Sequence, residues 1–317
     1  MLDKALSSWR GHHVLIAGTQ KSARFTQALL EELGASAVLI SPELNAQALC
    51  RAMTAHRVAA VIVPRMQELC GAGDSASACL SWLQMLLDEA REAGIPLVVL
   101  ATDAGVYRAQ SRPAREDDPL GGETREGLIQ SLFSLYADGV ARALAGDAVN
   151  TLIVHHMPCL SGDAPSVAQY ARWCDALLCG EVVPVEHPAM LGAFVHPLEV
   201  AHGVLMLGAV CLSLSQGGSY NLALEPTCLL PNRTAAQRLI ARAGGGRPIH
   251  ESEPPLFRPA QMLDGSRAKA LCGAVCRLPA EESLSMLFEL MQAERLGKTQ
   301  AQAVLRKQAQ RVLEGMR

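Results

Sequence analysis

Short apolar runs alternate along the chain with longer segments whose apolar residues recur at helical spacing. Apolar runs of four to eight residues bounded by Gly, Pro or Ser are typical of buried strands, and the i, i+3, i+4 spacing is typical of amphipathic helices. The strands are predicted at His13–Gly18, Ala37–Ile40, Val58–Val63, Pro96–Ala101 and Thr151–His155. The helices between them are predicted at Ala23–Leu33, Ala46–Ala55, Ser75–Ala93 and Arg125–Ala145. This alternation predicts an α/β fold with a doubly wound parallel sheet covered on both faces.

Beyond Gly162 the pattern becomes irregular. Helices are predicted at Ala168–Leu178, at Leu198–Leu214 and, with a polar composition, at Thr299–Met316. We therefore expect a Rossmann-like lobe formed by residues 1–161 plus 193–215, and a smaller, mixed C-terminal lobe formed by residues 162–192 plus 216–317.

Charge and hydropathy narrow the kinds of partner. The 317 residues are 50% hydrophobic and 19% charged, with a net charge of −3, and only five of the 28 basic residues are lysines. The scattered arginines form no cationic stripe, which argues against nucleic acid as the main partner. The longest apolar run, Val204–Leu214, is too short to span a bilayer, and the N-terminus lacks the order of a signal peptide. We expect no membrane partner and a cytoplasmic location.

Cysteine and histidine spacing gives no metal site. The ten cysteines include no CxxC pair, and most lie among Ala, Leu and Val, where a thiol packs as a small hydrophobe. The doublets His12/His13 and His155/His156 lie on predicted strands, where adjacent side chains point to opposite faces. Neither doublet can therefore chelate one ion by itself.

Six short motifs, in the correct order along the chain, carry a resemblance to a known family. Val98–Tyr107 resembles "SS..VYG" at the end of a strand, and Phe194–Leu205 resembles "FVHVDDVARA". The other four are Arg115–Leu120 ("E..P"), His156–Gly162 ("RLPNVYG"), Ser219–Ala223 ("VYNIG") and Met262–Leu284 ("D.SKA...LGW.P..SLEEGL"). Together they resemble the extended short-chain dehydrogenases/reductases, of the NAD-dependent sugar-nucleotide epimerase and dehydratase type.

The resemblance implies a cofactor loop that is altered here. In the family, GxxGxxG lets the pyrophosphate of NAD or NADP approach a helix N-terminus. This chain keeps Gly18 but has Lys21 and Arg24 at the other two positions, and Ser41 stands where the family reads the adenosine ribose. We expect no cofactor. Lys21 and Arg24, beside the free amides of the helix N-terminus, leave open the binding of a small anionic ligand.

The family's catalytic groups, a Ser/Thr and YxxxK, are also altered. Thr102 or Asp103 stands near the Ser/Thr position. Counting back from His156 places the YxxxK positions at Gln130 and Ser134, whereas counting forward from Pro119 places them at Glu126 and Gln130. No lysine occurs between Lys21 and Lys269, so neither register supplies the lysine that lowers the pKa of the tyrosine.

Two hypotheses about function follow. The substrate positions implied by the resemblance carry Cys159 in place of Asn and Gly192 in place of the Arg that grips a diphosphate. The first hypothesis is a catalytically degenerate protein that acts as a binding, partner or regulatory subunit. The alternative is an atypical NAD- or NADP-dependent enzyme acting on a sugar nucleotide or related small molecule, with acid and base groups drawn from Asp103, Glu116, Glu126, Tyr136, His155 and His156.

The two long helices predict assembly. Each has more than one apolar stripe, whereas a helix lying on a sheet buries only one. The stripes are Leu80/Leu83/Leu87 and Trp82/Met85/Leu86 in the first helix, and Leu128/Leu132/Leu135 and Ile129/Phe133/Tyr136/Val140 in the second. We expect a homodimer, or a heterodimer with a related enzyme, through these helices, with Trp82 and Phe133 at the contact.

Overall fold

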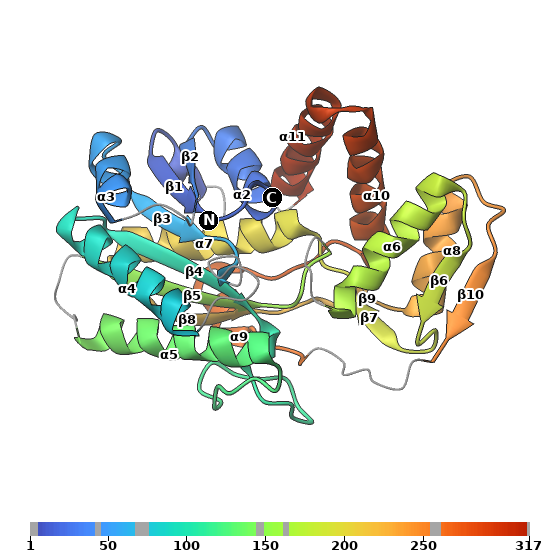
Figure 1. Cartoon of the computed structure of the whole chain (residues 1–317), viewed down its shortest axis with the longest axis horizontal. Helices are drawn as coiled ribbons and strands as arrows, with labels where there is room; N and C mark the ends of the chain where they lie inside the picture. Colours follow the sequence, from blue (N-terminus) through green and yellow to red (C-terminus); the bar gives the residue numbers. More distant parts are fainter. Residues whose placement is uncertain are drawn as a thin grey trace.

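A six-stranded parallel sheet forms the centre of the protein in a computed structural model that describes residues 6–41, 46–66, 76–143, 149–160, 165–253 and 261–315. Its strand order is β2-β1-β3-β4-β5-β8 (Figure 1). The strands are β1 (His13–Ala17), β2 (Ser36–Ile40), β3 (Ala60–Val63), β4 (Leu97–Asp103), β5 (Asn150–His156) and β8 (Gly218–Leu222). The predicted α/β class and doubly wound parallel sheet are confirmed.

Helices cover both faces of this sheet, which explains the near-continuous apolar runs of β1 and β3. Val14 and Ile16 of β1 belong to the core on one face, and Leu15 and Ala17 belong to the core on the other. Because successive strand residues point to opposite faces, a strand buried on both faces has no polar alternation. The first face is covered by α2 (Gln20–Glu32), α7 (Pro197–Leu214) and α11 (Lys298–Gly315), and the second by α3 (Ala46–Ala55), α4 (Ala76–Glu92) and α5 (Arg125–Ala143).

The connections reverse direction at the centre of the sheet. From β1 the chain passes through α2 to β2 on one side, and then through α3 back to β3 on the other side of β1. Loops leaving the carboxyl ends of β1 and β3 therefore diverge, and ligands of doubly wound sheets bind in the crevice that this divergence opens. Gly18 follows β1 and Pro64 follows β3 at this point.

A smaller lobe has a core of its own. It contains α6 (Pro165–Cys179), α8 (Asn232–Arg242) and one face of α10 (Ala280–Leu296), beside the paired strands β6 (Val183–Glu186) and β10 (Ile249–Ser252). Its aromatic centre is Tyr170, Trp173 and Phe194, with ring centroids 4.5 to 6.3 Å apart. The short antiparallel pair β7 (Leu191–Ala193) and β9 (Leu229–Pro231) lies beside it.

Three segments of residues 216–317, predicted for the smaller lobe, lie with the large one. β8 pairs with β5 in the central sheet, and α9 (Ser266–Cys272) packs on β8 and α7. The final helix, α11, contacts α2 and contributes Leu305, Ala309 and Val312 to the large-lobe core. Figure 1 shows α10 and α11 standing between α2 and the smaller lobe.

The apolar helix α7 passes through the large lobe as a core helix. It is the one helix in the described part of the chain long and apolar enough to cross a membrane, and 78% of it is buried inside the protein. Its glycines allow close packing: a Cβ at Gly203 would lie 2.6 Å from the Leu222 side chain, and one at Gly208 would lie 3.0 Å from the Trp9 ring. Trp9, in the short helix η1 (Ser7–Trp9), also donates a hydrogen bond from Nε1 to the Leu205 carbonyl at 2.9 Å.

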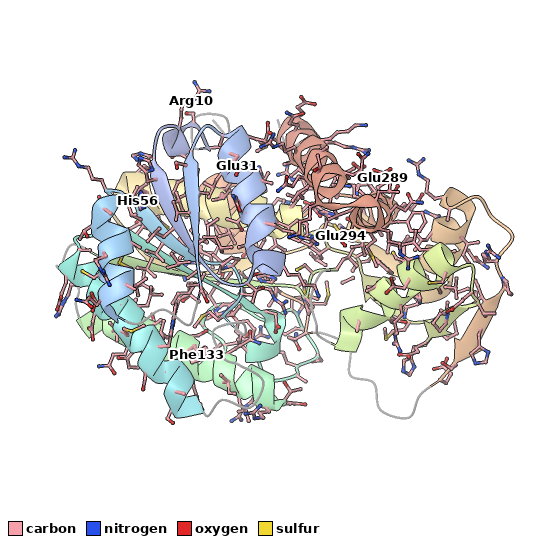
Figure 2. All side chains as sticks on the ribbon, turned by 45° about the horizontal axis from the view of Figure 1, so that its top comes forward. Arg10, Glu31, His56, Phe133, Glu289 and Glu294 are labelled. Carbon is pink, nitrogen blue, oxygen red and sulfur yellow. The ribbon has the colours of Figure 1, made fainter. Side chains whose placement is uncertain are left out.

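Of the two long helices, α5 exposes one of its two predicted apolar stripes, whereas the residues of both stripes predicted in α4 are buried or half-buried. Phe133, labelled in Figure 2, is fully buried. It belongs to the core on the second face of the sheet, together with Leu83 and Leu86 of α4. The expectation that Phe133 lies at a subunit contact is therefore wrong, and Trp82 is only half-buried against the same core. The residues that α5 exposes are Leu128, Leu132 and Leu135.

Candidate functional site

The turn between β1 and α2 is short and closely packed. β1 ends at Ala17 and α2 begins at Gln20, with Thr19 in an extended conformation as its N-cap. Gly18 is buried and donates its N–H to the Ile40 carbonyl at 3.3 Å. Near the start of α2, Ala23 is fully buried. The small residue that lets α2 approach the sheet here is therefore Ala23, one position earlier than the motif comparison suggested.

Arg24 turns outward from this turn. Its Nη1 pairs with the Glu294 carboxylate of α10, and its guanidinium lies 4.8 Å from the centre of the Phe25 ring. Figure 2 shows Glu294 on the side of α10 that faces α2. Lys21 and Ser41 are both exposed. Arg24, the first basic residue after Lys21, is therefore already paired with a carboxylate of the same chain.

Side chains of the protein largely fill the inner end of the crevice. Phe25 and Pro64 enclose a cavity of about 20 Å³ together with Arg65, His156 and Cys159. A water needs about 10 to 15 Å³ of such space, so this cavity has room for one water and not for a cofactor group.

Asp103 and Gln130 are joined at the carboxyl end of β4. The Asp103 N–H donates to Gln130 Oε1 at 3.0 Å, and Gln130 Nε2 donates to Asp103 Oδ2 at 3.4 Å. Asp103 Oδ1 also accepts the Gly105 N–H at 2.8 Å and so caps the short helix η3 (Ala104–Val106). One turn beyond Gln130, Ser134 is buried and its Oγ has no hydrogen-bond partner. The structure thus brings Asp103, Gln130 and Ser134 to one side of α5.

Thr102 and His155 form a second buried pair on neighbouring strands. Thr102 Oγ1 lies 2.6 Å from His155 Nδ1, and the Tyr107 ring stands edge-on to the imidazole at 5.3 Å. Burial, with a smaller contribution from His156, lowers the pKa of His155 to about 3. The imidazole is therefore neutral at physiological pH and a weak base.

The remaining acid and base candidates do not converge on one place. His156 lies with Nδ1 2.8 Å from the Met157 carbonyl, and burial lowers its pKa despite that contact and the nearby Asp103. Tyr136 packs towards α4, and its pKa is raised by burial and by Asp88. Glu116 accepts the Asn221 N–H at 2.8 Å, beside the hydrogen bond from Tyr107 Oη to Asn221 Oδ1. The side chain of Glu126 lies outside the described residues.

The position of Gly192 is closed by its neighbours. A Cβ there would lie 2.5 Å from Tyr170 Oη and 2.5 Å from Asn232 Oδ1. The Asn232 amide is held in place by the carbonyls of Glu186 and His187, at 3.0 and 3.2 Å. A longer side chain therefore cannot enter this space without moving Tyr170 or Asn232. Neither residue stands out in the sequence, because both look like ordinary members of helices.

Two further findings concern metal binding and a buried carboxyl group. No group of three or more His, Cys, Asp and Glu side chains among them could hold a metal ion. Glu199, on the first turn of α7, is almost fully buried, and its Oε1 accepts two backbone N–H groups. Glu199 lies in the motif Phe194–Leu205, and its burial is what we expect of a motif residue retained to pack the two lobes together.

Comparison with known proteins finds solved structures that share this fold. No family model and no curated protein sequence matches the chain. A UDP-glucose 4-epimerase from Stenotrophomonas maltophila, solved with bound NAD, superimposes with a TM-score of 0.72 and 15% identity, covering 90% of this chain and 99% of its own. A GDP-L-fucose synthetase from Naegleria fowleri bound to NADP gives 0.73 and 9%, covering 91% and 95%. A dTDP-glucose 4,6-dehydratase from Streptomyces venezuelae gives 0.67 and 15%, covering 91% and 99%.

This chain therefore shares the fold of these three enzymes, which is the fold implied by the resemblance of the sequence motifs. At 9% to 15% identity, these matches concern the fold and leave the activity to be argued from the site.

Proposed function

We propose that this protein is a catalytically degenerate relative of the NAD-dependent epimerases and dehydratases, acting as a binding, partner or regulatory subunit. The observation that carries the proposal is the pairing of Asp103 with Gln130, with Ser134 one turn further along α5. These three residues take the places of the catalytic Ser/Thr, Tyr and Lys in this proposal. An amide and a hydroxyl have no accessible pKa with which to move a proton at neutral pH.

The crevice supports the same proposal from the cofactor side. Pro64 and Arg65 follow β3, the cavity behind them measures about 20 Å³, and Arg24 is engaged by Glu294. These residues do not fit a dinucleotide, so we infer that none is held. A small anion remains the proposed ligand of the β1–α2 turn, and it has to compete with the Glu294 carboxylate for Arg24.

The alternative is an atypical enzyme that uses Asp103 and His156. The observation in its favour is that these two groups lie close enough for Asp103 to oppose the lowering of the His156 pKa. A redox version of this alternative needs NAD or NADP, whereas the degenerate protein does not.

Calorimetric titration tests the proposal. We expect no saturable binding of NAD(H) or NADP(H), and a dissociation constant below about 10 μM, worth roughly 7 kcal/mol, would contradict it. Sulfate is titrated in parallel as a probe of the anion idea, into the wild type and Arg24→Ala. Equal heats in the two proteins would remove Arg24 from any anion site.

The partner surface in this proposal is the outer face of α5. Leu128, Leu132 and Leu135 are 50%, 45% and 52% exposed. An antiparallel crossing of two such helices sets Leu128 against Leu135 of the partner subunit. Self-complementarity of this kind favours a symmetric homodimer. The alternative is a heterodimer with a related enzyme that exposes a similar apolar stripe on the corresponding helix.

A further inference from the structure

Glu199 lies where the chain crosses from one lobe to the other. The segment 273–279 leaves α9, which packs on β8 and α7 of the large lobe, and leads into α10. One face of α10 packs on α6 and α8 of the smaller lobe, while Met286 and Leu290 belong to the large-lobe core. We call residues 273–279 the crossing. The contacts that hold the crossing in place therefore also fix the position of α10 between the lobes.

The Glu199 carboxyl group binds backbone N–H groups of the crossing. Oε1 accepts the N–H groups of Arg277 and Leu278, at 2.5 and 2.6 Å. Oε2 is buried and has no hydrogen-bond partner, and the residue is only 1% exposed. A buried carboxylate with one oxygen unpaired is costly, and taking up a proton relieves that cost.

The charged and titratable groups around Glu199 come from each element packed against it. Glu282 of α10 repels its charge and Arg277 of the crossing attracts it. The thiols of Cys228, in the short helix η4 (Pro226–Cys228), and of Cys276 also face it. His202, one turn along α7, is kept neutral by burial, with a pKa of about 4.

Burial outweighs the two backbone hydrogen bonds and the attraction of Arg277, and it raises the pKa of Glu199 from 4.5 to about 7. A group whose pKa is higher in the docked state stabilises that state most at low pH. The contribution is complete below about pH 4.5, declines as the pH rises and is lost above about pH 7.

We propose that Glu199 is a proton-controlled latch, in which loss of the carboxyl proton loosens the 273–279 crossing and the docking of α10 between the lobes. The latch belongs to the fold and operates whether or not the protein is catalytic, so it stands apart from the proposed function.

Hydrogen exchange of the full-length protein at pH 5.5 and pH 8.0 tests the latch. After correction for the intrinsic pH dependence of exchange, the opening of peptides covering 273–296 should increase about 10- to 30-fold between these pH values, which follows from the pKa difference. Glu199→Gln keeps an oxygen for both backbone bonds and should show no such increase. Glu225→Gln is the matched control, because Glu225 is a nearby carboxylate that pairs with Lys269 instead, and it should behave as the wild type does.

Infrared spectroscopy of the wild type keeps the test independent of how well the variant folds. A protonated-carboxyl band should be present at pH 6 and disappear at pH 8. An opening that does not change with pH in the wild type, an undiminished pH effect in Glu199→Gln, or the absence of that band would each overturn the latch.

Discussion

At the scale of single residues, Asp103 and Gln130 are joined by two hydrogen bonds at the carboxyl end of β4. The family motifs that flank these positions leave Thr102 or Asp103, and Gln130 with either Ser134 or Glu126, as candidates, and the structure brings Asp103, Gln130 and Ser134 together. The closed space beside Gly192 could not be found, because it depends on Tyr170 and Asn232, which lie 22 and 40 residues away in the sequence. The motif comparison assigns to Arg24 the position where a small residue packs on the sheet. In the structure the turn after β1 is compact, and the small residue buried at that place is Ala23.

Restoring the missing catalytic pair is the prediction at this scale. Gln130→Tyr with Ser134→Lys should not give epimerase or dehydratase turnover, because the crevice and the Gly192 space remain altered. The measurement is an assay of the double variant with sugar nucleotides in the presence of NAD or NADP. Detectable turnover would mean that the crevice is more open than its 20 Å³ cavity indicates. Circular dichroism of the variant checks that the buried Lys has not unfolded it.

At the scale of elements, the regular part of the chain was predicted well and the irregular part was not. The predicted strands and helices up to β5 match the structure to within a few residues, because each has a long apolar run or a clear helical period. β8 was not recognised as a sheet strand, since its sequence Gly-Ser-Tyr-Asn-Leu has no strong strand pattern. Its pairing with β5 comes from tertiary packing, which overrides local preference.

The exposed stripe of α5 gives the prediction for assembly. Light scattering at micromolar concentration should give about twice the 33.8 kDa chain mass, and Leu132→Glu should shift it towards the monomer. Leu214→Glu is the matched control, because Leu214 is an exposed leucine, 56% accessible, on another helix. Phe133→Ala should instead lower the free energy of unfolding by about 3 to 5 kcal/mol, as expected for a buried aromatic residue. A monomeric wild type with no co-purifying partner would rule out this surface.

At the scale of the whole molecule, α10 and α11 bind the lobes into one unit. Glu294 and Arg295 of α10 pair with Arg24 of α2 and Asp175 of α6, and Arg306 of α11 pairs with Glu31 of α2. The Rossmann-like lobe could be predicted from its alternating pattern, but the return of α11 to α2 could not, because a polar helix carries no signal of what it covers.

Removal of α11 is the prediction at this scale. A chain ending at Leu296 loses Leu305, Ala309 and Val312 from the large-lobe core and uncovers α2. We expect a lower unfolding midpoint in urea and new binding of a hydrophobic dye, because the apolar side chains of α2 and α7 then face water. A truncated chain as stable as the full one would show that α11 is peripheral to the core.

The contact of α11 with α2 also has a consequence for synthesis. Gln310 of α11 donates to Glu32 of α2 across 278 residues of sequence, so the outer face of α2 is covered only after α11 has been made. Domains generally fold as their residues leave the ribosome, and contacts so distant in sequence form late. Until α11 has been made and has packed, the outer face of α2 therefore remains uncovered, so we expect the large-lobe core to be completed late in folding.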